Sequence, residues 1–310
     1  MEHLEKARES AYWDLYREGV DALHAARLAE AETVLQQALE EARRRRLRLL
    51  ADRAYCNWAA VRIERGLPAV ETGGVVEGLS AILGRSRDLK ARQLAAYDLA
   101  CLYRVQGRNR PGRLYAEIAE RLAATGGDVQ SRAVSRHLLG LLWLGDGRME
   151  QARRCIEEAL EMGLQGGRGQ GAVVLSTLGY CLSLTGEPAR GMHLLEQSLA
   201  SLGEPLSPLY EPSLHLNIGF ACLELGDLDA AIHHGEHVLR LEHREGRDGR
   251  SGDESKYARY LVGEALVQRG SAGQAREHFE VLRQEFYPEI PDLPELLLAC
   301  RTHSLLNWLA

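Results

Sequence analysis

The sequence predicts an all-α protein made of seven helix–turn–helix repeats, followed by a final helix that caps the C-terminal end. Two observations support this fold class. Two series of small residues recur with a period near 40 residues along the chain, and the composition favours helix almost throughout. Only 9 of 310 residues are prolines. Ala, Leu, Glu and Arg, which lose little free energy on entering a helix, are abundant.

The first series of small residues falls within apolar helical segments. Its members are Gly19, Ala59, Ala100, Gly140, Gly179, Gly219 and Gly263. A second small residue follows seven positions later each time, and these residues are Ala26, Gly66, Gly107, Gly147, Gly186, Gly226 and Gly270. Both series have intervals of 40, 41, 40, 39, 40 and 44 residues, so two independent markers stay in step. Such periodicity is the sequence signature of a repeat architecture.

Each unit is interpreted as an apolar helix, a turn at the second small residue, and an amphipathic helix. A glycine just past a helix end adopts a positive φ without steric penalty. In the fourth unit, Ala152, Ile156 and Ala159 are spaced by four and three residues and therefore form one apolar stripe. One array over residues 1–310 is expected, with repeats near 12–45, 52–85, 93–125, 133–163, 172–202, 212–242 and 256–286 and a cap at 294–309.

The order of these residues resembles the tetratricopeptide repeat (TPR) family over about residues 12–285, with pairs such as Leu139-Gly140 followed by a turn glycine and an alanine. The period of about 40 residues exceeds the family's usual 34 or so. The second repeat departs from the pattern because Glu71 replaces a small residue and Gly73, Gly74 and Gly78 follow. Its second helix is therefore expected to be short or displaced. The resemblance implies a right-handed superhelical TPR-like solenoid.

The resemblance also implies that the first helix of each repeat lines a concave peptide-binding groove. In this register the predicted peptide-binding residues are Asn57, Asn217, Trp13, Tyr16, Tyr97, His137, Tyr180, Phe220, Tyr257 and Tyr260. Related arrays use asparagine to bind the main chain of a peptide, because an amide both donates and accepts hydrogen bonds. The alternative is that the asparagines serve hydrogen bonds between repeats and the aromatic rings pack between neighbouring repeats.

The leading functional hypothesis is a protein-interaction module that binds a peptide, a disordered segment or a partner helix in this groove. A second hypothesis is a ligand-responsive regulator, whose output element is expected in another protein because no DNA-binding unit fits before residue 12. A remote alternative is an enzyme that uses His137 or Tyr180 as an acid or base in the groove. Self-association, with a neighbouring copy's C-terminal segment in the groove, also stays open.

Charge and composition limit the classes of molecule that the protein is expected to bind. The net charge of -6, divided as +4 over residues 1–113 and -10 over the remainder, disfavours nucleic acid and acidic membranes. No apolar run approaches the ~20 residues that cross a bilayer, and the start lacks a signal-peptide pattern. A cytoplasmic location is expected. The six widely spaced cysteines are expected to be reduced and buried.

Sequence signatures of catalysis and cofactor binding are missing. The chain has no GxSxG, GxxxxGK[ST] or HExxH motif, and the glycine-rich residues 166–171 lack a preceding strand and a following Lys-Ser/Thr. No catalytic residue, cofactor or metal site is therefore predicted. His233, His234 and His237 are the best metal candidates, since residues 233 and 237 share a helical face. Without a carboxylate or cysteine to complete the set, a solvated surface is the expectation.

Overall fold

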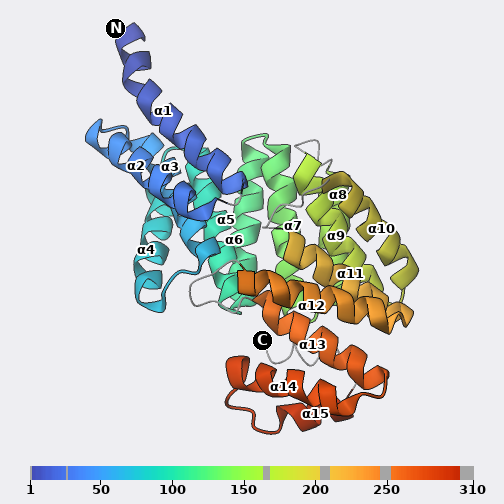
Figure 1. Ribbon diagram of the computed structural model, residues 1–310. Coiled ribbons are helices and arrows are strands. Elements are labelled where there is room, and N and C mark those ends of the chain that lie inside the picture. The colour runs from blue at the N-terminus through green and yellow to red at the C-terminus, as the bar shows by residue number, and fades with distance from the viewer. Residues whose placement is uncertain (1, 26, 163–167, 203–209, 245–252, 301–310) are drawn as a thin grey trace. The chain divides into compact units, whose positions relative to one another are not determined.

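The computed structural model describes residues 2–25, 27–162, 168–202, 210–244 and 253–300 (Figure 1). Within these ranges the regular secondary structure consists of α-helices alone, as the composition predicts. The chain divides into two compact units. Unit 1 comprises residues 1–146 and 161–163, and unit 2 comprises residues 147–160 and 164–310. The boundary therefore falls inside the fourth predicted repeat.

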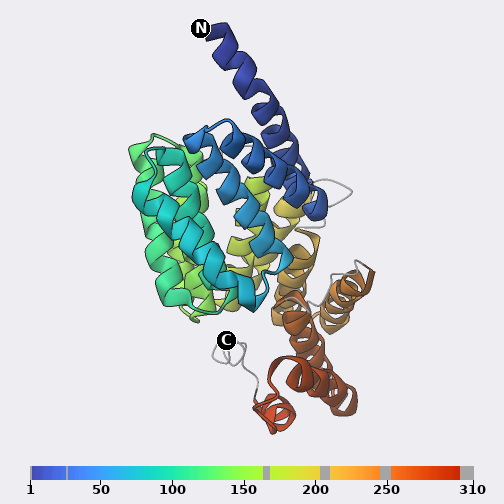
Figure 2. The same cartoon turned by 90° about the vertical axis from the view of Figure 1, so that its left-hand side faces the viewer.

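The helices follow one another without intervening strands in both units. Unit 1 contains α1 (Glu2–His24), α2 (Leu28–Arg44), α3 (Arg48–Arg65), α4 (Ala69–Arg85), α5 (Leu89–Val105), α6 (Asn109–Thr125) and α7 (Val129–Gly145). Unit 2 contains most of α8 (Met149–Glu161) and all of α9 (Arg168–Leu184), α10 (Pro188–Leu202), α11 (Glu211–Leu225), α12 (Leu228–Arg244), α13 (Asp253–Gln268), α14 (Ala272–Phe286) and α15 (Leu293–Ala299). Most consecutive helices within a unit pack together, such as α9 with α10 in unit 2, and Figure 2 shows this arrangement for α5 and α6 in unit 1.

The turn between the two helices of each predicted repeat has the backbone that the sequence pattern requires. The second marker is a glycine with a φ of 67–93° in six repeats, and these glycines are Gly66, Gly107, Gly147, Gly186, Gly226 and Gly270. Ala26, the marker of the first repeat, lies outside the described residues. The first helices begin one to four residues before the predicted repeats, and α1 begins ten before. The count of seven repeats stays a prediction.

The first series of markers lies at close helix crossings. A Cβ atom on Gly179 in α9 would lie 2.8 Å from the carbonyl oxygen of Gly191 in α10. A Cβ atom on Gly219 in α11 would lie 2.5 Å from Leu261 in α13. Small residues are therefore required where neighbouring helices approach each other, because a larger side chain would force the backbones apart.

The second helix of the second repeat is displaced, as one of the two predicted alternatives states, but it is not short. Helix α4 spans 17 residues despite its glycines, and it packs mainly against α5 rather than against its predicted partner α3. Gly73 and Gly74 have nothing within 4 Å of an added Cβ, so these two residues are not needed for packing. Gly78 is different, because a Cβ there would overlap the Tyr55 ring of α3.

The first part of the predicted cap at 294–309 is helical. Helix α15 ends at Ala299 because Cys300 has an extended backbone, with φ -117° and ψ 119°. Residues 301–309 lie outside the described residues. Cys300 is exposed and Cys101 is partly exposed, so the expectation that all six cysteines are buried is wrong for these two. None of the cysteines forms a disulfide. No helix of the described chain is long and apolar enough to cross a membrane.

Candidate functional site

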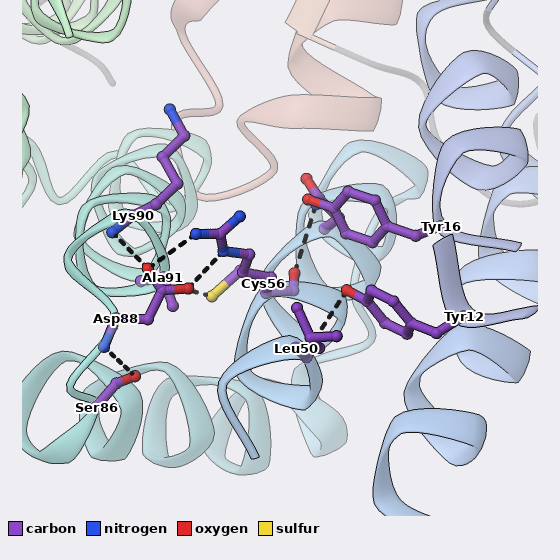
Figure 3. A network of polar contacts seen from close by, with 10 residues as sticks. Tyr12, Tyr16, Leu50, Cys56, Ser86, Asp88, Lys90 and Ala91 are labelled. Carbon is purple, nitrogen blue, oxygen red and sulfur yellow. Dashed lines mark hydrogen bonds and ion pairs between the residues drawn. The ribbon is translucent and has the colours of Figure 1, made fainter. Parts of the chain in front are cut away.

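A polar network joins the first helices of the first two repeats in unit 1 (Figure 3). The amide nitrogen of Asn57 on α3 donates to the Tyr16 hydroxyl on α1 at 2.6 Å. One turn before Tyr16, the Tyr12 hydroxyl donates to the Leu50 carbonyl at 3.0 Å. Burial raises the pKa of both tyrosines, so both hydroxyl groups are neutral; that of Tyr12 donates and that of Tyr16 accepts. Two predicted site residues, Tyr16 and Asn57, are thus in direct contact.

The same network continues from α3 to the start of α5 and then to α7. Arg53 forms an ion pair with Asp88, with a second contact of 3.1 Å between Nη2 and Oδ1. Burial opposes ionisation of Asp88, but the pair with Arg53 and hydrogen bonds from the backbone of Lys90 and Ala91 together lower the pKa of the carboxyl group. The Lys90 ammonium on α5 then contacts Asp128 at 2.8 Å and Ser131 at 2.6 Å. Each step crosses from one repeat to the next.

Asn217 repeats the role of Asn57 in unit 2. Its amide nitrogen on α11 donates to the Ser176 hydroxyl of α9 at 2.9 Å. Asn57 and Asn217 each bond to a residue 41 positions earlier, so both side chains bridge neighbouring first helices. Neither amide oxygen makes a hydrogen bond to another described residue. The inter-repeat hydrogen bond therefore uses the donor side of each amide.

Three of the predicted aromatic residues of unit 2, Tyr180, Phe220 and Tyr260, form a row with Phe279 across the last three repeats. Ring centroids lie 5.6 Å apart for Tyr180 and Phe220, 6.4 Å for Phe220 and Tyr260, and 6.5 Å for Tyr260 and Phe279. Phe220 and Tyr260 are only 3% and 1% exposed and belong to the hydrophobic core. Tyr180 and Tyr257 are half-buried and pack against that core. Three rings of the row, Phe220, Tyr260 and Phe279, are therefore buried in the core, and Tyr180 is half-buried.

The predicted residues of unit 1 differ in exposure. Trp13 and Tyr16 are half-buried and pack edge to face, with centroids 5.7 Å apart. Tyr97 on α5 is also half-buried, and burial raises its pKa. His137 on α7 is 8% exposed, and burial lowers its pKa to about 4. Burial also raises the Tyr180 pKa, so His137 and Tyr180, the residues of the enzyme hypothesis, are respectively a weak base and a weak acid.

Sequence reasoning missed Asp98 on α5, which occupies the same repeat position as Asn57 and Asn217, two residues before the small marker. Its side chain is 4% exposed, and its Oδ2 atom has no hydrogen-bond partner in the part of the chain that the structure describes. Burial raises the pKa of the carboxyl group well above its usual range, because the charged form loses its hydration there. Asp98 follows Asn57 by 41 residues, and this repeat interval is the signal in the sequence that could have identified it.

Contrary to the expectation from the sequence, the three histidines of α12 are not all solvated. His233 is exposed, but His234 and His237 are half-buried against α11. His237 contacts Glu211 at 3.0 Å, and His234 contacts His215 at 2.8 Å between Nδ1 atoms. Burial, together with nearby His237 and His234, lowers the pKa of His215 to about 4. The carboxylate that sequence reasoning sought on α12 comes from α11 instead.

No protein-family model matches the chain, and no curated protein matches it. Several solved structures do. A Rap protein complexed with competence and sporulation factor has a TM-score of 0.70 at 11% identity, over 93% of this chain and 80% of that chain. NprR in complex with its cognate peptide NprX has a TM-score of 0.64 at 12% identity, over 92% and 81% respectively.

A tetratricopeptide repeat protein from Parabacteroides merdae has a TM-score of 0.50 at 14% identity, over 93% of this chain and 97% of that chain. These similarities to helical repeat proteins agree with the resemblance that the sequence pattern indicates. The chain therefore has a TPR-like helical repeat fold.

Proposed function

We propose that this chain, which has a TPR-like fold, binds an extended peptide or a disordered segment of a partner protein along the first helices of its repeats. The observation that carries the proposal is the matched geometry of Asn57 and Asn217. Each amide donates to the preceding repeat and has no described partner for its oxygen. An oriented carbonyl oxygen of this kind is suited to accept a hydrogen bond from a peptide N–H group.

The inter-repeat hydrogen bond gives each asparagine a fixed orientation before a ligand arrives. An extended peptide exposes main-chain N–H groups that must find acceptors once they leave water. A preorganised acceptor lowers the entropy cost of binding, which is large for a flexible ligand. Two such acceptors, Asn57 in unit 1 and Asn217 in unit 2, favour recognition of the main chain by each unit.

The half-buried aromatic side chains near these amides supply apolar contact area. Trp13 and Tyr16 accompany Asn57, whereas Tyr180 and Tyr257 accompany Asn217 on neighbouring first helices. Tyr and Trp combine a rigid apolar ring with a polar group, which suits recognition surfaces. Phe220 and Tyr260 are core residues, so their proposed role is to support the surface rings from beneath.

The bound molecules of two similar structures agree with this proposal. The Rap structure holds competence and sporulation factor, and the NprR structure holds its cognate peptide. The proposal is limited to the binding step and assigns no catalytic residue. We also propose that the protein is cytoplasmic and that its ligand is neither a membrane nor a nucleic acid. The regulator hypothesis would couple an output to the same binding step.

Selection of a random peptide library displayed on phage against the full-length chain tests the proposal. We expect an enriched peptide whose Kd is about tenfold higher for at least one of the variants Asn57→Ala and Asn217→Ala than for the native chain, because a ligand N–H group loses its acceptor. Fluorescence anisotropy of the labelled peptide measures the change. Absence of an enriched peptide, or equal affinity of the native chain and both variants, would contradict the proposal.

Control variants separate the loss of the oxygen from the loss of the inter-repeat bond. Tyr16→Phe and Ser176→Ala remove the hydroxyl groups that accept from the two amides but leave the amide oxygens in place. We expect these variants to weaken peptide binding only about two- to threefold, since they affect orientation alone. Gln197→Ala removes an exposed amide on α10, a second helix, and is expected to leave the affinity unchanged.

A further inference from the structure

Five polar side chains gather where α11 meets α12 in the sixth predicted repeat. Glu211 and His215 are spaced by four residues at the start of α11 and therefore lie on one face of that helix. His234 and His237 are spaced by three on α12, and His233 lies beside them. All of these residues belong to unit 2, and α11 packs directly on α12.

Close packing of the two helices brings these side chains together. Gly219 lies one turn after His215, and a Cβ atom there would lie 3.2 Å from the Cβ atom of His234. The absence of a side chain at position 219 thus lets α12 approach α11 at the level of the histidines. The rings of His215 and His237 then lie 4.2 Å apart, and those of His215 and His234 lie 5.1 Å apart.

Three of these residues have the donor types and the spacing of a metal site. The candidate ligand atoms of Glu211, His215 and His237 all lie within 4.8 Å of one another. The Glu211 Oε1 and His237 Nε2 atoms are 3.0 Å apart. In a tetrahedral zinc site with bonds of about 2.0–2.2 Å, neighbouring ligand atoms are roughly 3.4 Å apart. Small rotations of these side chains therefore suffice to place one ion between them.

We propose that Glu211, His215 and His237 form a binding site for a divalent transition-metal ion, which zinc represents in the test below. Two imidazoles and one carboxylate are a common zinc donor set. Three protein ligands leave the fourth position of a tetrahedral ion to water. The ion would join α11 to α12 and thereby stabilise the sixth repeat. This site is separate from Asn57 and Asn217 and does not depend on the proposed peptide binding.

His234 is assigned as a positioning residue. A distance of 2.8 Å between its Nδ1 atom and that of His215 requires a proton on one of the two nitrogens. When His215 donates from Nδ1, its Nε2 lone pair is available to a metal ion. Such hydrogen bonds to the second ring nitrogen fix the tautomer and the ring orientation of metal-binding histidines. His234 thus prepares His215 for coordination.

Isothermal titration of the untagged full-length chain with zinc, after removal of bound metal by a chelator, tests the site. We expect one zinc ion per chain with a Kd in the micromolar range or tighter, and a rise in the Tm with saturating zinc, because a ligand that binds only the folded state stabilises it. Glu211→Gln, His215→Ala and His237→Ala should each raise the Kd at least about a hundredfold. His234→Ala should raise it roughly tenfold.

Two features of the variants keep the test decisive. Glu211→Gln preserves a hydrogen-bonding side chain opposite His237, so its loss of zinc affinity cannot result from a missing hydrogen bond. His233→Ala removes an exposed histidine from the same helix and should leave zinc affinity unchanged. For His234→Ala, the Tm without zinc should stay within a few degrees of the native value while zinc affinity falls. Absence of stoichiometric binding, or binding lost in His233→Ala but kept in His215→Ala and His237→Ala, would overturn the proposal.

Discussion

Gly191→Ala should reduce the free energy of unfolding of unit 2 by about 2–3 kcal/mol, although alanine is the better helix former. An added Cβ atom at position 191 in α10 would lie 2.5 Å from the carbonyl oxygen of Gly179 and 3.0 Å from the backbone nitrogen of Ser183, both in α9. Backbone atoms cannot turn away as a flexible side chain can, so the two helices must separate. Urea denaturation followed by far-ultraviolet circular dichroism measures the loss.

Gly273→Ala is the matched control in the same unit. This glycine lies in α14, and nothing stands within 4 Å of an added Cβ atom. Alanine there should leave the free energy of unfolding unchanged or raise it by up to about 1 kcal/mol, because only helix propensity changes. If Gly191→Ala and Gly273→Ala had the same effect, the close crossing of α9 and α10 would be wrong.

Phe279→Ala should be more damaging still and lower the free energy of unfolding by about 3–5 kcal/mol. Phe279 in α14 is fully buried, and its ring lies where a Cβ atom of Gly263 in α13 would otherwise be. It also ends the aromatic row that begins at Tyr180. Truncation therefore removes buried apolar area and leaves a cavity between α13 and α14. Urea denaturation measures this loss as well.

Leu225→Ala serves as the control for Phe279→Ala. Leu225 ends α11 and is 47% exposed, so its truncation should change the free energy of unfolding by no more than about 0.5 kcal/mol. A Phe279→Ala variant as stable as Leu225→Ala would show that the ring is not part of a packed core.

The repeat geometry was predictable from the sequence because it depends on small residues. Gly66 and Gly226 mark turns because positive φ is inexpensive only for glycine, and Gly179 marks a crossing because only a small residue fits there. The expectation of a short or displaced second helix in the second repeat is half right, because α4 packs away from α3 but is not short. Gly73 and Gly74 in that helix relieve no packing constraint, so they weaken helix propensity without ending the helix.

The candidate sites were only partly predictable, because they depend on which side chains meet across two helices. The repeat register identified Asn57 and Asn217 and left open whether they bind a peptide or form hydrogen bonds between repeats. The structure shows the inter-repeat hydrogen bonds of that alternative. It also placed Phe220 in the groove, whereas the structure buries that ring in the core. The meeting of His237 with Glu211 depends on how α12 packs on α11, which helical spacing within α12 alone cannot reveal.

The most direct test of peptide binding combines Asn217→Ala with N-methylation of the selected peptide, one main-chain nitrogen at a time. If the Asn217 oxygen accepts from a ligand N–H group, methylation of that nitrogen should weaken binding to the native chain but have little further effect on Asn217→Ala. The coupling energy from this double-mutant cycle should be about 1 kcal/mol at one peptide position. Additive effects at every methylated position would show that Asn217 does not bind the peptide main chain.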